Sequence, residues 1–366
     1  MKVRYSYLKQ QFSNSDDLWK KLKKFVSTGD FTLGSPLVNF EKNFAKLIGT
    51  KYAVGVNSGT DAIKLSLKSL GIQSGDEIIT SANTFVATIG AINEVGAKIV
   101  FVDCDDSFCM DVNLLEKKIT SKTKAIIPVH FTGYMANMVQ VMKIAKKYNL
   151  FVVEDACQSI LGSINGINAG RWGHTGAFSL HPLKNINVWS DGGIITTSNI
   201  KLYKKLLLLR NHGLKNRDTV EILGYNSRLD TIQAVVGNWL LPKAKSIARK
   251  RINNAKFLDN KLKNVNQIRI PKRLKNQKIV YHLYVLFAQN RDKLLKYCHK
   301  KGVEAKIHYP VPIYLQKALK KLNHKKGDFP VTDRHAKEII TFPCDQHLRK
   351  EQLLYIVKTI KNFYKK

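Results

Sequence analysis

Short apolar runs alternate with amphipathic segments between about residues 50 and 200. Runs rich in β-branched residues predict strands, whereas apolar positions at helical spacing predict helices. The expected strands are 52–56, 76–80, 98–102, 125–129, 150–154 and 194–197, and the expected helices are 62–70, 84–95, 114–119, 138–148 and 201–209. Continuous apolar strands separated by helices are typical of a parallel sheet covered on both faces, so we expect a doubly wound α/β domain. Ligands of such a domain bind at the carboxyl ends of the strands.

The pattern changes in the last third of the chain. A long helix is expected from about Asp230 to Asn260, with a break at Pro242 because proline cannot donate the helical hydrogen bond. Residues 278–287 alternate like a half-exposed strand, and helices are expected near 291–301 and 349–364. These shorter, mixed elements indicate a second unit of the α+β type.

The length of 366 residues suffices for two domains. We expect a large α/β domain over 1–244, with the first 30 or so residues packing elsewhere, and a smaller C-terminal α+β domain over 245–366. The sequence has neither the apolar core of a signal peptide nor about 18 consecutive apolar residues for a membrane span. Its five cysteines form no Cys-x-x-Cys pair, which predicts reduced thiols, no metal site and a cytoplasmic protein.

The chain is strongly basic, with 61 Lys and Arg against 27 Asp and Glu and a formal net charge of +34. A basic protein can bind nucleic acid by displacing counterions from the phosphates. However, the densest runs, 20–24 and 296–301, are typical of solvated helix faces, and the sequence contains no zinc-finger, helix-turn-helix or aromatic RNA-binding motif. We therefore expect no nucleic-acid partner, although a positive field would attract a small anionic substrate.

One lysine has neighbours that suit a specific chemistry. Lys184 follows a hydroxyl residue, Ser179, and both lie downstream of Asp155, which ends an apolar predicted strand. These are the minimum groups for holding pyridoxal phosphate (PLP): the lysine forms the Schiff base, and the carboxylate keeps the pyridine nitrogen protonated. The alternatives are an ordinary solvated surface lysine and a carboxylate that caps a helix.

Other side chains suit the same cofactor. Gly59 and Thr60 join a predicted strand to a helix, where their amides would bind an anion or form an ordinary helix cap. Phe85 would stack on a planar ring or pack in the core, and Gln158 would reach a ring hydroxyl. His308 and Tyr309 would offer an imidazole and a hydroxyl near a substrate, or pack in the interior. We predict no metal ligands.

A set of motifs carries a resemblance to a known family. They are Ser-Gly-Thr-Asp-Ala (58–62), Ala-Asn-Thr-Phe-Val-Ala-Thr (82–88), Pro-Val-His-Phe-Thr-Gly (128–133), Glu-Asp-Ala-Cys-Gln-Ser (154–159), Phe-Ser-Leu-His-Pro-Leu-Lys-Asn (178–185), Asp-Gly-Gly (191–193), Gly-Tyr-Asn-Ser-Arg-Leu-Asp (224–230) and His-Tyr-Pro-Val-Pro (308–312). In order and spacing, from about Phe31 to Pro343, the chain resembles the DegT/DnrJ/StrS-type sugar aminotransferases. These are fold-type I PLP enzymes that aminate keto-sugars carried on nucleotides.

The resemblance implies a role for each matched position. Lys184 is the Schiff-base lysine and proton shuttle, Asp155 the partner of the pyridinium nitrogen, and Gln158 the contact of the ring hydroxyl. The remaining cofactor contacts are the phosphate ligands Gly59, Thr60 and Ser179, the ring-stacking Phe85, and Asn226, which crosses a homodimer interface to the partner's phosphate. His308 and Tyr309 lie on the substrate side.

The resemblance also implies an activity. An amino donor, L-glutamate, passes its amino group to the cofactor and then to a keto-sugar nucleotide, for the biosynthesis of surface polysaccharide or glycoconjugate sugars. Two departures from the family pattern stand side by side. Ser190 replaces a glycine, for which we expect a local adjustment without loss of activity. The bulky Trp189 would line the sugar pocket or serve as a hydrophobic packing residue.

Two alternatives remain. The first is a PLP-dependent sugar dehydratase of the same fold, but that branch of the family carries histidine at the position of Lys184. The second is a non-catalytic regulatory or nucleic-acid-binding relative, motivated by the charge of +34.

Overall fold

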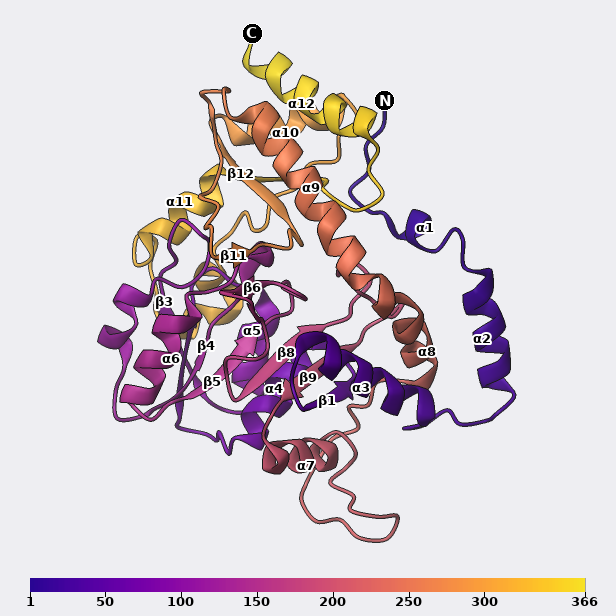
Figure 1. Ribbon diagram of the computed structural model, residues 1–366. Helices are drawn as coiled ribbons and strands as arrows, with labels where there is room; N and C mark the ends of the chain where they lie inside the picture. Colours follow the sequence, from indigo (N-terminus) through magenta and orange to yellow (C-terminus); the bar gives the residue numbers. More distant parts are fainter. Residues whose placement is uncertain (366) are drawn as a thin grey trace.

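The computed structural model describes residues 1–365, and a seven-stranded sheet forms its centre (Figure 1). In spatial order the strands are β1 (Tyr52–Val56), β9 (Gly193–Thr197), β8 (Thr175–Ser179), β5 (Phe151–Asp155), β4 (Thr123–Ile127), β2 (Glu77–Ser81) and β3 (Lys98–Val102). Only β9 runs against its neighbours, β1 and β8, and the other pairs are parallel. The predicted mostly parallel sheet is therefore confirmed, although β8 was not predicted.

Helices cover both faces of this sheet. They are α3 (Ser35–Ile48), α4 (Gly59–Ser69), α5 (Val86–Glu94), α6 (Met138–Lys147) and α7 (Ile200–Leu209). Alternate residues of a strand belong to different apolar clusters: Val152 packs in one and Val153 in the other. Because successive side chains of a strand point to opposite faces, this alternation shows two cores separated by the sheet.

The long predicted helix is interrupted where proline was expected to break it. It consists of α8 (Thr231–Leu240), a 3-10 turn (Leu241–Lys243) that contains Pro242, and α9 (Ala244–Leu262). The helix predicted over 114–119 is instead a pair of 3-10 turns, Val112–Leu114 and Glu116–Lys118. The break at Pro242 could be predicted from the sequence because proline acts on the backbone locally.

The last third of the chain forms a smaller sheet. Its strands are β10 (Ile268–Arg269), β12 (Tyr284–Ala288) and β13 (Ile339–Phe342), in the order β10-β12-β13, flanked by α10 (Arg291–Lys300), α11 (Pro330–Glu338) and α12 (Lys350–Tyr364). The prediction of a half-exposed strand over 278–287 is wrong, because β12 begins at Tyr284 and is buried along its whole length. As the central strand it is covered by its neighbours on both edges.

A third, minor sheet joins β6 (Ser163–Ile164) to β7 (Ile167–Asn168) and β11 (Gln277–Lys278). Two short 3-10 segments, Ile313–Leu315 and Lys317–Leu322, lie between α10 and α11. No helix within residues 1–365 is long and apolar enough to cross a membrane.

The N-terminal segment packs away from the central sheet. The Val3 amide donates to the carbonyl of Gly302 at 2.8 Å, and the Glu304 amide donates to the carbonyl of Val3 at 3.0 Å. Two helices follow, α1 (Leu8–Gln11) and α2 (Asp16–Val26), of which α2 packs against α8 (Figure 1). Conversely, Tyr314 and Phe329 from the last third of the chain pack in the same apolar cluster as β1 of the central sheet. The chain thus crosses between its two parts several times, and the division at 244/245 stays a prediction.

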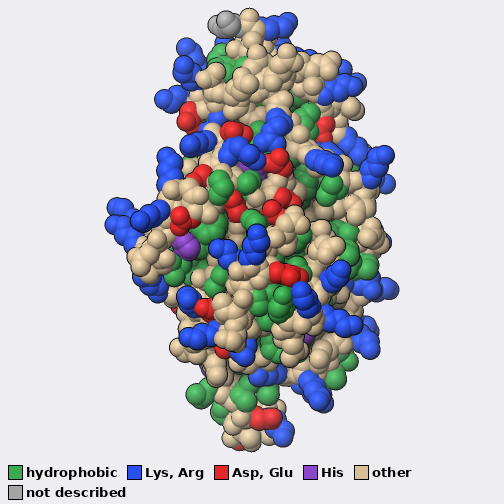
Figure 2. Space-filling model, turned by 90° about the vertical axis from the view of Figure 1, so that its left-hand side faces the viewer, with side chains coloured by type: hydrophobic (Ala, Val, Ile, Leu, Met, Phe, Trp, Pro, Cys, Tyr) green, Lys and Arg blue, Asp and Glu red, His purple; other side chains and the backbone are tan. Residues whose placement is uncertain are grey.

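The basic side chains are dispersed over the surface. On the face shown in Figure 2, Lys and Arg are spread over the whole outline, with Asp and Glu between them. This distribution is that of solvated helix faces, as the sequence indicated, and it forms no single stripe on this face that would follow a phosphate backbone.

Candidate active site

A cavity of about 390 Å³ lies where the carboxyl ends of β5 and β8 meet the smaller sheet and the N-terminal segment. Eight of the predicted residues line it: Gly59, Thr60, Phe85, Gln158, Ser179, Lys184, His308 and Tyr309. Three larger hollows, of about 650, 850 and 440 Å³, are lined by none of these eight residues. The structure therefore brings together, at the sheet edge where ligands of α/β proteins bind, side chains that are far apart in the sequence.

The amino end of α4 faces this cavity. Ser58 caps the helix, since its hydroxyl accepts the amide of Asp61 at 3.0 Å. Within residues 1–365, the amides of Gly59 and Thr60 have no hydrogen-bond acceptor. A Cβ atom on Gly59 would lie 2.8 Å from Cβ of Ser179, so glycine lets α4 approach β8. A helix end with free amides beside a serine hydroxyl is a donor set suited to a phosphate.

Asp155, the last residue of β5, lies just behind the cavity wall. Its carboxylate accepts the hydroxyl of Thr88 at 2.7 Å and the amide of Cys157 at 3.2 Å. The side chain is buried, yet no Lys, Arg or His nitrogen of residues 1–365 lies within 4.0 Å of it. A buried carboxylate without a cation is costly, and a protonated ring nitrogen would provide that cation.

Gln158 is held in the cavity wall by the loop after β4. Its Oε1 accepts the amide of Thr132 at 2.7 Å, and the side chain is buried. This bond orients the amide group, whose nitrogen donates to no residue that the structure describes. The side chain thus retains donors for a ligand oxygen.

Lys184 lies in the loop between β8 and β9, where its amide donates to the carbonyl of His181 at 2.8 Å. Its side chain is partly exposed to the cavity, but the surrounding protein lowers the pKa of its amino group by burial. Cys157 and Asp155 oppose this effect and raise the same pKa. Burial has the largest effect, so a larger fraction of Lys184 is a neutral, nucleophilic amine than for a lysine in water.

The opposite wall carries His308 and Tyr309. His308 Nδ1 lies 3.0 Å from the Thr341 hydroxyl, and burial, with Lys306 and Lys184, lowers the pKa of His308 to about 4. The imidazole is therefore neutral at neutral pH. Burial also raises the pKa of Tyr309, which keeps its hydroxyl protonated, and its ring lies 5.6 Å from that of Phe85.

Two predicted residues lie outside the cavity. Asn226 is exposed and pairs through its backbone with Asn211. Trp189 lines a separate surface hollow and packs its ring against Phe12 at 5.8 Å and Trp19 at 5.4 Å. Within this chain the geometry favours hydrophobic packing for Trp189, because its ring contacts two aromatic neighbours and does not line the cavity that contains Lys184.

Sequence reasoning missed several side chains that line the cavity, among them Tyr5, Tyr7, Arg251 and His282. They come from the N-terminal segment, from α9 and from the approach to β12. The spacing of Tyr5 and Tyr7 fits one face of an extended segment, but that signal is weak on its own. Arg251 carried no local signal, because its neighbours meet it only in the folded chain.

The sequence is similar to those of known proteins over nearly its whole length. The family model described as "DegT/DnrJ/EryC1/StrS aminotransferase family" matches residues 13–361. The "Pleiotropic regulatory protein" of Geobacillus stearothermophilus is 36% identical over 352 residues, 95% of each chain. The UDP-N-acetyl-3-dehydro-alpha-D-glucosamine 3-aminotransferase of Acidithiobacillus ferrooxidans is 36% identical over 347 residues, 94% of this chain and 93% of that one.

The fold agrees with that of a solved family structure. The crystal structure of DesV from S. venezuelae, in complex with a ketimine intermediate, superposes with a TM-score of 0.97 at 32% identity, over 100% of this chain and 99% of that one. The predicted fold class of the PLP-dependent aminotransferases is thereby confirmed. On these matches, which run through nearly its whole length, the chain belongs to the DegT/DnrJ/EryC1/StrS aminotransferase family.

Proposed function

We propose that this protein is a PLP-dependent aminotransferase that converts a keto-sugar linked to a nucleotide into the corresponding amino-sugar nucleotide. One observation carries the proposal: a lysine with a lowered pKa lines the cavity beside a buried carboxylate that has no cationic partner. The family adds support, since the relative from A. ferrooxidans is named for amination of a UDP-linked sugar.

The residues present fit the cofactor. The amides of Gly59 and Thr60 with the Ser179 hydroxyl would hold the phosphate, and Asp155 and Gln158 would hold the ring nitrogen and ring hydroxyl. Phe85, about half of whose side chain is exposed, would cover a ring face. When bound, PLP supplies an electron sink for the carbon that loses its proton.

Lys184 has two tasks in this proposal. Its amino group attaches the cofactor, and once free it takes a proton from the α-carbon of the donor and returns one during amination of the sugar. The lowered pKa favours the neutral amine that this transfer needs. The neutral His308 and the protonated Tyr309 face the same space and offer hydrogen bonds to an uncharged sugar.

Further parts of the proposal concern partners. We propose L-glutamate as amino donor, a product used for surface polysaccharides or glycoconjugates, and a homodimer in which Asn226 reaches the phosphate of the partner's cofactor. The exposure of Asn226 outside its own cavity supports this. We also propose a cytoplasmic location, which the five unpaired cysteines support.

The test is a product assay. The PLP-loaded protein is incubated with L-glutamate and a panel of keto-sugar nucleotides, and the products are identified by mass. The wild type should form an amino-sugar nucleotide, and Lys184→Ala should form none. A Lys184→Ala protein that turned over at the wild-type rate, or a dehydrated sugar as the wild-type product, would overturn the proposal.

A further inference from the structure

Arg251 of α9 is a buried cation on the wall of the cavity that contains Lys184. Only 3% of the residue is exposed, and no Asp or Glu carboxylate of residues 1–365 lies within 4.0 Å of its guanidinium. Burying a charge is costly unless an opposite charge or hydrogen bonds compensate it. A guanidinium in this situation at a cavity wall indicates an anionic ligand.

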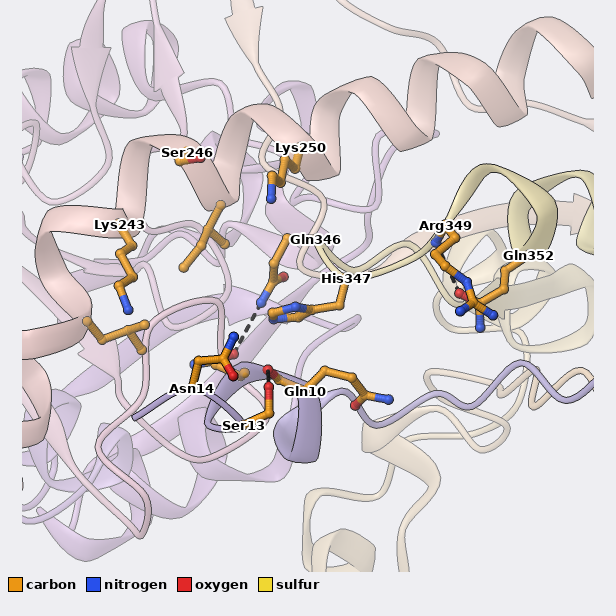
Figure 3. A pocket seen from close by; sticks show the side chains of 13 residues that line it. Gln10, Ser13, Asn14, Lys243, Ser246, Lys250, Gln346, His347, Arg349 and Gln352 are labelled. Atoms are coloured by element: carbon orange, nitrogen blue, oxygen red, sulfur yellow. Dashed lines mark hydrogen bonds between the residues drawn. The ribbon is translucent and has the colours of Figure 1, made fainter. Parts of the chain in front are cut away.

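The guanidinium is held by neutral acceptors. Its Nε donates to Oε1 of Gln346 at 3.0 Å, and its Nη1 donates to the carbonyls of Tyr281 at 3.0 Å and His282 at 3.4 Å. Gln346 in turn donates to Oε1 of Gln11 at 3.1 Å, a bond seen in Figure 3 from the side of a neighbouring hollow. Within residues 1–365 no acceptor bonds Nη2. The group is therefore fixed in orientation while it keeps donors for a ligand.

That neighbouring hollow is also basic, but it differs from the Arg251 site. Figure 3 shows Lys243, Lys250 and Arg349 around it, and all three are long surface side chains. All three residues are exposed, so water can hydrate their charges. Arg251 is buried and lacks this hydration. Its charge is therefore stronger evidence for a bound anion than the charges of the three exposed residues.

Asp191 and Asp345 are the acidic side chains among the cavity-lining residues, and Asp345 is the one whose charge interacts with Arg251. Its carboxylate accepts the amide of His347 at 2.8 Å and remains more than 4.0 Å from the guanidinium. Burial raises the pKa of Asp345, and Arg251 opposes this effect. Asp345 thus reduces the net charge of this wall without occupying the guanidinium.

Tyr7 links Arg251 to Lys184. The centre of its ring lies 4.9 Å from the guanidinium carbon, and its hydroxyl donates to the carbonyl of Lys184 at 3.0 Å. One aromatic side chain therefore contacts both the guanidinium of Arg251 and the backbone carbonyl of Lys184. Burial and the charges of Lys184 and Arg251 lower the pKa of His282, so both cations lie near that imidazole in the cavity.

We propose that Arg251 binds the α-carboxylate of the amino donor; this assignment rests on the proposed function. An α-carboxylate is bonded to the carbon that loses its proton, so it must stay beside Lys184. The diphosphate of a sugar nucleotide is separated from the reacting carbonyl by the sugar ring. The cofactor phosphate has its own donors at the amino end of α4. Nη2 of the guanidinium, which bonds no acceptor among residues 1–365, can donate to a carboxylate oxygen in a charge-assisted hydrogen bond.

The test compares two amino donors in a half-reaction that needs no sugar. L-Glutamate and 4-aminobutyrate, which lacks the α-carboxylate, are each mixed with the PLP-loaded protein, and the cofactor absorbance is followed. The wild type should prefer L-glutamate strongly, and in Arg251→Lys and Arg251→Gln the preference should fall about 10- to 100-fold, the effect of losing a charged hydrogen bond. Arg249→Gln, an exposed residue of the same helix outside the cavity, should keep it.

Binding gives a second readout. Glutarate lacks an amino group and cannot react. Calorimetric titration should show that Arg251→Gln binds it at least about tenfold more weakly than Arg249→Gln does. The ratio between two donors is measured within one protein, so it remains valid if a variant is partly unstable. If neither Arg251 variant folds, the wild type alone decides, since a lack of preference for L-glutamate over 4-aminobutyrate would overturn the assignment.

The outcomes separate this inference from the proposed function. If both variants keep the donor preference and instead raise the KM for the keto-sugar nucleotide, Arg251 binds the diphosphate and the assignment is wrong. If the wild type reacts with L-glutamate in the half-reaction but aminates no keto-sugar nucleotide, the proposed function fails while the result at Arg251 still stands.

Discussion

The cavity has two walls that are built in different ways. One consists of strand ends and the loops that follow them, and it carries Gly59, Ser179 and Lys184, with Asp155 just behind it. The other combines the N-terminal segment, α9 and the smaller sheet, and it carries Tyr7, Arg251 and His308 among others. The first wall is fixed by the central sheet alone, whereas the second exists only when remote segments meet. We infer that the first wall supplies the chemistry and the second selects the molecules that undergo it.

The largest effect should follow the loss of the lysine. In Lys184→Ala, turnover should fall by about a thousandfold or more, because both the attachment point and the proton carrier are gone. Borohydride reduction followed by mass spectrometry should attach the cofactor to the wild type and not to the variant. Lys201→Ala, an exposed lysine at the start of α7, should behave as the wild type. Retained labelling in Lys184→Ala would show that another lysine holds the cofactor.

Asp155→Asn keeps the size of the side chain and removes its charge. We expect roughly a hundredfold slower turnover, since the ring nitrogen loses its partner. The Asp155 carboxylate raises the pKa of Lys184, so the variant should lower that pKa further. The pH dependence of cofactor association with the apo-protein measures this, and its midpoint should move to lower pH. An unmoved midpoint would mean that the two groups do not interact.

Gly59→Ala tests the close approach of α4 to β8. The new Cβ would lie 2.8 Å from Cβ of Ser179 and 3.0 Å from Sγ of Cys157, which should weaken PLP binding about tenfold and cost about 1–3 kcal/mol of unfolding free energy. Equilibrium dialysis and urea unfolding measure the two effects. The control is Gly90→Ala in α5, where no atom lies within 4 Å of the added Cβ and alanine should stabilise the helix by about 0.5–1 kcal/mol.

The protein should lose folding stability at acidic pH because of a residue of the second wall. The pKa of His308 is about 4 in the folded protein and about 6.5 in an unfolded chain, so the unfolded state binds more protons between these values. Stability is therefore complete above pH 6.5 and is lost as the pH falls toward 4, by on the order of 2 kcal/mol from this residue. His308→Gln should flatten this part of the stability profile, measured by urea unfolding at a series of pH values. An unchanged slope would show that His308 is not buried as described.

The first wall was largely predictable from the sequence, and the second was not. Asp155 follows the predicted strand 150–154, and strand ends of a parallel sheet converge on one edge. Lys184 precedes the predicted strand 194–197, although β8 on its other side was not predicted. The break at Pro242 was predicted for the same reason, because its cause is local. Arg251 looks like any other cation of a basic helix until the fold surrounds it. Trp189 shows the converse, since its bulk next to Ser190 suggested the sugar pocket while its aromatic neighbours hold it outside the cavity.

The pairing of Val3 with Val303 has a consequence for how the protein is made. Val3 and its neighbours find their partners only after some three hundred further residues have been synthesised. The central sheet can close long before that, since its last strand ends at Thr197. A nascent chain would thus possess Lys184 and its strand-end neighbours while Tyr7 still waited for its place against Arg251. Such long-range closure delays the complete pocket until the segment around Val303 has been synthesised.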